Sequence, residues 1–228
     1  MPHPEPNPTA PRRVVVTGAS IACALGFEIE EFWRGLLEGR SGISRIPTIP
    51  DDSPLPVKIA GRIEDTALDA ALARYDLRDP DRANQLALYV VGRALEEAGF
   101  RTDAAAQPLE IDLIFATGHG NVGMTNEATR VFYAEGYRKL RPTTVVRGMF
   151  NRPANIASIR FQLTGTSYVV SCACASGSIA FGQAYQQIRW GEADVAVAAC
   201  ADSGLDLPTF AAWNRLGVLL PLDQAKDE

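Results

Sequence analysis

Short, largely apolar runs alternate along the chain with longer segments in which apolar residues recur at helical spacing. A short apolar run of this kind predicts a strand that is covered on both faces. Such runs lie at residues 14–18, 111–116, 168–170 and 195–199. The longer segments predict amphipathic helices at residues 28–37, 83–98, 125–133, 152–161 and 175–190. A stretch rich in proline and aspartate, residues 46–56, predicts an irregular surface loop.

This alternation indicates an α/β fold, with a mostly parallel sheet and helices packed on both of its faces. The length of 228 residues suits one such domain or a closely joined pair. Prolines at every second position open the chain, which predicts an extended, solvated lead over residues 1–12. The ordered domain is then expected over residues 13–228.

Composition narrows the functional classes. The chain carries 22 Lys and Arg against 27 Asp and Glu, a formal net charge of −5, which argues against a general nucleic-acid binder. Its hydrophobic content of 46% is enough for a packed core and rules out wholesale disorder. No run approaches the roughly 18 apolar residues that a membrane helix needs, so no membrane span is expected.

Cysteine usage points to free thiols. The cysteines lie at positions 23, 172, 174 and 200, without a CxxC pair, and only His3 and His119 could join them as metal ligands. Neither a structural metal site nor a disulfide framework is therefore expected. The N-terminus lacks the apolar core of a secretory signal, and the setting is expected to be reducing and cytoplasmic. Cys23 and Cys200 are interpreted as core residues.

Cys174 lies where a predicted strand runs through small residues into a predicted helix. A thiol beside a helix N-terminus meets unpaired backbone N–H groups and the positive end of the helix dipole, and both favour the thiolate. Small neighbours would let a carbonyl group approach and leave backbone donors free for an oxyanion. The pattern thus indicates a nucleophile, with a buried packing role as the alternative.

Several segments, in order and spacing, resemble the β-ketoacyl-[acyl carrier protein] synthases of fatty-acid and polyketide synthesis, members of the thiolase-like superfamily. The resemblance covers residues 13–223. The segments that carry it are Val14–Gly18, Leu25-Gly26, Phe32-Trp33, Leu36–Ile43, Asn155–Ala157, Ala173–Gly177 and Gly191–Val195. It implies the N-terminal half of a thiolase-like fold, in which Cys174 is the acyl-accepting nucleophile.

The resemblance also implies the reaction. Such synthases transfer an acyl group from the phosphopantetheine of an acyl carrier protein to the cysteine, and then condense it with a decarboxylating malonyl group in a Claisen reaction. No bound cofactor is expected. The family's two histidines and its lysine belong to a second half, beyond the last residue of this sequence, so condensation by this chain alone is not expected. A homodimer, or a heterodimer with a synthase-like chain, is expected.

Two residues of the glycine-rich turn after the strand at 111–116 are candidates for a substrate pocket. His119 resembles a position near the family's acyl channel. Asn121 stands where an apolar residue commonly gates the acyl pocket, which favours polar or unusual acyl chains. Other departures from the family are Gln162 and Thr166, where glycine and proline are usual, and Asp202, where glutamate is usual.

A cluster of positive charge offers a docking surface for an acidic carrier protein. Seven arginines and lysines lie between positions 130 and 160, with Glu135 among them. Clustered charge of this kind can steer an oppositely charged partner. The docking candidates are Arg74, Arg78, Arg82, Arg138 and Lys139. A solvated face or a subunit contact is the alternative.

Two other functions stay open. A non-catalytic partner subunit, like the chain-length factors that pair with active synthases, typically lacks the cysteine that is present here. A Cys174–His119 pair could instead serve a cysteine-dependent acyl hydrolase or transferase, for which a dyad is sufficient.

Overall fold

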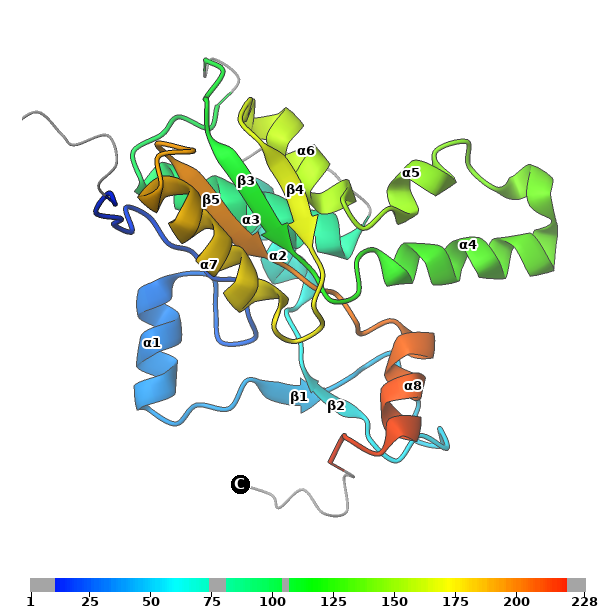
Figure 1. Cartoon of the computed structure of the whole chain (residues 1–228). Helices are drawn as coiled ribbons and strands as arrows, with labels where there is room; N and C mark the ends of the chain where they lie inside the picture. The colour runs from blue at the N-terminus through cyan, green and yellow to red at the C-terminus, as the bar shows by residue number, and fades with distance from the viewer. Residues whose placement is uncertain (1–10, 74–80, 104–106, 221–228) are drawn as a thin grey trace, which may run out of the picture.

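The computed structural model describes residues 11–73, 81–103 and 107–220. Its centre is a three-stranded parallel sheet in the order β4 (Ser167–Val170), β3 (Asp112–Ala116), β5 (Ala196–Cys200) (Figure 1). The register places Ile114 beside Tyr168 on one side and beside Ala198 on the other. The carboxyl ends of the three strands therefore meet at one edge of the sheet.

Helices cover both faces of this sheet, as the alternation of apolar segments predicts. Figure 1 shows α7 (Ser176–Arg189) on one face, with α3 (Arg82–Glu97) and α6 (Arg152–Phe161) on the other. Along β3, Leu113 and Phe115 are buried against α3 and α6, while Ile114 and Ala116 are buried against α7. This two-residue alternation of buried apolar side chains confirms the predicted α/β architecture.

Smaller elements surround the central layers. The hairpin of β1 (Ile43–Arg45) and β2 (Ile59–Gly61) lies below the sheet in Figure 1, near α8 (Leu207–Leu216). Ile46, Ile49, Val57 and Phe210 form a small core there. The predicted surface loop at residues 46–56 therefore contributes two buried apolar anchors, which its proline and aspartate content conceals.

An arm extends away from the sheet (Figure 1). It consists of α4 (Val122–Glu135), the short 3₁₀ helix η1 (Tyr137–Lys139) and α5 (Thr144–Gly148). The remaining helices are α1 (Ile29–Leu37) and α2 (Asp65–Ala73). In the described part of the chain, no helix has the length and apolar character needed to cross a membrane.

The predicted buried strand at residues 14–18 is wrong. No described strand pairs with this segment, and Val16 is 83% exposed. The segment is held at its two ends instead: the Arg12 amide donates to the Arg189 carbonyl at 2.8 Å, and Gly18 packs so closely on α3 that an added Cβ would lie 2.3 Å from the Ala94 oxygen. A β-branched run favours extended backbone, but a strand also needs a hydrogen-bonded neighbour.

Several apolar helix faces are also exposed. On α1, which forms where the spacing of apolar residues predicts it, Trp33 and Leu37 are exposed. On α7, Phe181 and Tyr185 are exposed on the side opposite the sheet. Amphipathic spacing thus identifies these helices, but the described residues do not cover their whole apolar stripes. The predicted lead of residues 1–12 lies outside the described residues, apart from Pro11 and Arg12.

Candidate active site

Cys174 lies in a tight turn between β4 and α7. The strand ends at Val170, the helix begins at Ser176, and Cys174 is exposed between them. The preceding residue, Ala173, has a left-handed backbone with φ of 51°, which costs a residue with a Cβ about 1–2 kcal/mol. A strained residue beside an exposed thiol is a typical feature of a reactive turn.

A buried hydroxyl holds this turn. Ser176 is 3% exposed, and its Oγ accepts the Cys172 amide at 2.7 Å and donates to the Ala173 carbonyl, also at 2.7 Å. The Ser176 amide bonds to that same carbonyl at 3.1 Å. These bonds fix the backbone on both sides of Cys174, which lies just before the N-terminus of α7, the positive end of the helix dipole.

Asp202 ties the neighbouring glycine-rich turn to the end of β5. Its carboxylate accepts the Thr117 hydroxyl at 2.7 Å, the Gly118 amide at 2.9 Å and the His119 amide at 2.9 Å. Gly118 in turn lies close to the nucleophile turn, since an added Cβ would stand 3.6 Å from the Ala173 oxygen. Sequence reasoning noted Asp202 only as a departure from its family. The contact of Asp202 with the glycine-rich turn could have been expected because two neighbouring parallel strands end at Ala116 and Cys200.

His119 faces Asp202 and α8. Its Nδ1 is 3.6 Å from Asp202 Oδ1, and its ring makes an edge-to-face contact with Trp213 at 5.6 Å between centroids. Nδ1 is buried without a hydrogen-bond partner. Among the hydrogen bonds and ion pairs of the described residues, none joins His119 to Cys174, so the Cys174–His119 dyad finds no support in this geometry.

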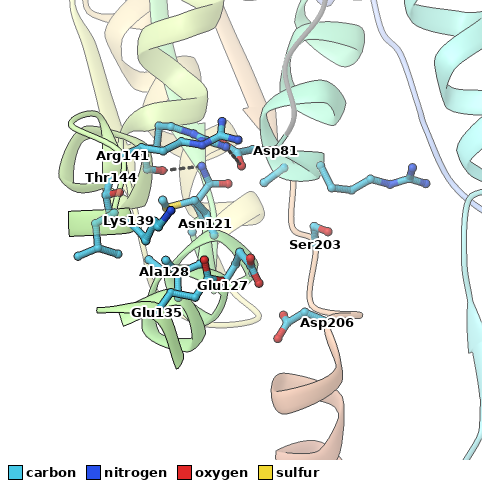
Figure 2. Close-up of a pocket in the computed structure, with 18 residues that line it drawn as sticks. Asp81, Asn121, Glu127, Ala128, Glu135, Lys139, Arg141, Thr144, Ser203 and Asp206 are labelled. Carbon is cyan, nitrogen blue, oxygen red and sulfur yellow. Dashed lines mark hydrogen bonds and ion pairs between the residues drawn. The ribbon is translucent and has the colours of Figure 1, made fainter. Parts of the chain in front are cut away.

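A pocket of about 600 Å³ begins where the glycine-rich turn ends (Figure 2). The arm of α4, η1 and α5 forms one wall, and the segments that begin α3 and precede α8 form the other. Gly120 and Asn121 belong to its lining, whereas His119 and Cys174 do not. Of the two pocket candidates from the sequence, the structure therefore places only Asn121 in this cavity.

The docking candidates fall into three groups. Arg138 and Lys139 are exposed on η1. Arg82 is bound within the chain, to the Asp65 carboxylate and the Ile63 carbonyl. Arg74 and Arg78 lie outside the described residues.

The excess positive charge of the segment is also smaller than its sequence indicates. Arg130 pairs with Glu127 at 2.7 Å, and Glu135 lies 3.7 Å from the same guanidinium. The hydrogen bond from Arg130 lowers the pKa of Glu127, which keeps that carboxylate charged.

The interpretation of Cys200 as a core residue is wrong: it ends β5 and is exposed. Cys23 is half-buried, and all four cysteines are free thiols. Across the described ranges, no three His, Cys, Asp or Glu side chains form a group that could hold a metal ion.

Cys200 is expected to alkylate slowly at neutral pH. Partial burial of its sulfur raises the pKa of the Cys200 thiol, and the negative charge of Asp202 raises it further. A raised pKa leaves less thiolate at pH 7, and the thiolate is the reactive form. Iodoacetamide labelling followed by peptide mapping between pH 6 and 10 should show Cys200 reacting at higher pH than a cysteine in an unstructured, uncharged peptide. Equal pH profiles for the two thiols would contradict this.

Solved structures share this architecture. The chain superposes on the ishigamide ketosynthase/chain length factor with a TM-score of 0.80 and 26% identity, over 93% of this chain and 52% of that one. The fold is therefore that of the thiolase-like ketosynthases. The model of the family "Beta-ketoacyl synthase, N-terminal domain" matches residues 11–227. The chain belongs to this family, as its sequence motifs indicate.

Sequence relatives from other organisms support the same family assignment. Nodulation protein E of Rhizobium leguminosarum bv. trifolii is 31% identical over 210 residues, which is 92% of this chain and 52% of that protein. The chloroplastic 3-oxoacyl-[acyl-carrier-protein] synthase I of Hordeum vulgare is 29% identical over 203 residues, 86% of this chain and 44% of that protein. The chain thus spans about half the length of the relatives it matches.

Proposed function

We propose that this chain supplies the acyl-accepting cysteine of a β-ketoacyl synthase. Cys174 would take an acyl group from a thioester on the phosphopantetheine of an acyl carrier protein. The observation that carries this proposal is the exposed Cys174 in a turn held by Ser176, directly before α7. Membership of the ketosynthase family and the name of the Hordeum vulgare relative, 3-oxoacyl-[acyl-carrier-protein] synthase I, support an acyl thioester on a carrier protein as the substrate class.

The transfer follows from nucleophilic catalysis. The Cys174 thiolate attacks the thioester carbonyl, and a C–S bond forms to Cys174 in a tetrahedral oxyanion. The C–S bond to pantetheine then breaks, and the departing thiolate takes a proton from solvent. Because α7 begins directly after the turn, its unpaired N-terminal N–H groups favour the oxyanion. The covalent acyl-enzyme divides a difficult condensation into two easier steps.

Decarboxylating condensation needs groups beyond this turn. A carbanion formed by loss of carbon dioxide requires partners that stabilise an enolate. In the part of the chain that the structure describes, the one histidine is His119, which faces Asp202 and Trp213. By family resemblance, two histidines and a lysine of a second half fill this role. The chain alone is therefore expected to accept acyl groups without elongating them.

A time course of acylation separates this function from its two competitors. The protein is incubated with octanoyl-pantetheine, and intact mass and released pantetheine are followed together. A stable octanoyl adduct with one equivalent of pantetheine supports the acyl-accepting half of a synthase. Continuous pantetheine release without an adduct indicates a hydrolase. Neither adduct nor release indicates a non-catalytic subunit like a chain-length factor, and either of these results overturns the proposal.

We also propose that Arg138 and Lys139 contribute to carrier docking. Both are exposed, and neither has an ion-pair partner among the described residues. Reversing both charges to glutamate is expected to weaken binding of an acidic carrier protein about tenfold at low salt, with a smaller effect at high salt. The matched control reverses Arg34 and Arg101, which gives the same net charge elsewhere. Equal weakening by both variants would reject this docking site.

We further propose that this chain works as a dimer. The solved relative that pairs a ketosynthase with a chain length factor supports pairing of this chain with itself or with a synthase-like partner. We propose a cytoplasmic setting from the free thiols, whereas the Hordeum vulgare relative is named as a chloroplastic enzyme.

A further inference from the structure

Asp81, Asn121 and Arg147 of the 600 Å³ pocket lining belong to one connected polar network, together with Asn84 behind them. Arg147 on α5 binds both carboxylate oxygens of Asp81, at 3.0 and 2.7 Å. Asn84, which is fully buried, donates to the same carboxylate at 3.3 Å. Asn121 donates to the Asn84 side-chain oxygen at 3.4 Å and to the Arg147 carbonyl at 2.8 Å. A closed network of this kind holds each of its side chains in one orientation.

The orientation of Asn121 follows from its partner. A backbone carbonyl only accepts hydrogen bonds, so the amide nitrogen of Asn121 has to face the Arg147 oxygen. The amide oxygen then points the other way. Figure 2 shows the Asn121 oxygen on the side away from the dashed hydrogen bond, and it has no hydrogen-bond partner within the described ranges. Asn121 is 5% exposed as a residue and belongs to the pocket lining, so the pocket wall presents an amide oxygen that no described protein group occupies.

This acceptor lies within reach of an acyl chain on Cys174. Gly118 approaches the Ala173 carbonyl, next to Cys174, and Asn121 follows three positions later in the same turn. Three residues span at most about 10 Å. Asp202 holds Gly118 and His119 by their amides, so this short connection is rigid. A chain of medium length that starts at Cys174 and enters the pocket would pass Asn121.

We infer that the pocket selects acyl chains that carry a hydroxyl group at the position facing Asn121. This inference rests on the proposed acyl-accepting function of Cys174. A hydroxyl donates to the free amide oxygen of Asn121, whereas a saturated chain covers that oxygen and leaves it without a partner. The loss of water from an unpaired buried acceptor is unfavourable, so the site discriminates against plain alkyl chains as well as favouring hydroxylated ones.

The expected result is a preference that depends on hydroxyl position. A series of octanoyl-pantetheine thioesters, unsubstituted or with one hydroxyl at successive carbons, is offered to the protein, and the rate of acylation at Cys174 is measured by mass spectrometry. One position should react roughly two- to tenfold faster than the unsubstituted chain, the range that one net hydrogen bond provides. This arm uses the unaltered chain and needs no variant to fold.

The variant arm replaces Asn121 with leucine, which has a similar volume and no acceptor. The ratio of the rates for the hydroxylated and the unsubstituted chain should fall to parity or reverse, and this ratio within each variant is the quantity compared. Asn155, exposed on α6 and away from the pocket, gives the matched control Asn155→Leu, which should keep the parent preference. Thermal melting checks that each variant is folded.

The outcomes distinguish a failure of the pocket assignment from a failure of the proposed acyl-accepting function. Acylation at Cys174 with no dependence on hydroxyl position, or an unchanged preference in a folded Asn121→Leu protein, overturns the pocket assignment and leaves the proposed function standing. No acylation at Cys174 by any member of the series overturns the proposed function, and the pocket assignment with it.

Discussion

Replacing Cys174 with alanine is expected to lower the rate of acylation by a thioester at least about a hundredfold, to the level of the other exposed thiols. The structure gives one sulfur the position before α7 in a turn fixed by Ser176. Removing that sulfur removes the atom that forms the new bond, and no described side chain can substitute for it there. The measurement is the release of pantetheine from octanoyl-pantetheine, followed against time.

Cys172 gives the matched control. It is also exposed and free, and it lies two positions earlier in the same turn. Its contact with Ser176 uses the backbone amide, which Cys172→Ala retains. If the position at the helix start decides reactivity, this variant keeps most of the parent rate. Equal losses in the two variants, or parent-like release by the Cys174→Ala protein, would refute the assignment.

Gly165→Ala is expected to destabilise the fold by about 2 kcal/mol, within the usual range for overpacking. Gly165 lies between α6 and β4, and an added Cβ would stand 2.4 Å from Asp112 Oδ1 and 2.6 Å from the carbonyl of Ile111. Asp112 Oδ1 also accepts the Thr166 amide at 2.7 Å, so its displacement would disturb the start of β4. For a chain of this length, the melting temperature should fall by roughly 4–8 °C.

Gly182→Ala is expected to stabilise the fold, in contrast to Gly165→Ala. Gly182 lies inside α7, and apart from its chain neighbours and the helix's own backbone no atom lies within 4 Å of an added Cβ. Alanine there reduces the entropy of the unfolded chain and favours the helix by about 0.5–1 kcal/mol. A differential melting experiment on the two variants compares them directly. A melting temperature for Gly165→Ala at or above that of Gly182→Ala would show that the close approach at Gly165 is not rigid.

Sequence reasoning found the elements whose signal is local. The helix at residues 152–161 has the predicted bounds, and the three sheet strands begin and end within a residue of expectation. Each of these elements lies in the central layers, where apolar periodicity reflects burial directly. The position of Cys174 could also be predicted, because a strand, small residues and a helix are adjacent in the sequence.

Features that depend on distant residues could not be found in this way. The run Val14–Gly18 has the composition of a strand, but the pairing that makes a strand is a property of its neighbours. The Asp202 carboxylate contacts Thr117 and Gly118, about 85 positions earlier. The ion pair between Asp81 and Arg147 likewise joins separate elements. Such contacts appear only once the parallel strands place their carboxyl ends together.

Fragment-ion mapping of the acylated protein addresses the nucleophile most directly. After brief incubation with octanoyl-pantetheine at pH 7, the peptide that spans residues 171–180 is sequenced by tandem mass spectrometry, and the peptides that contain Cys23 and Cys200 are quantified beside it. The octanoyl group is expected on Cys174, with little on Cys172, Cys200 or Cys23. An acyl group spread evenly over the exposed cysteines, or placed mainly on Cys172, would contradict this expectation.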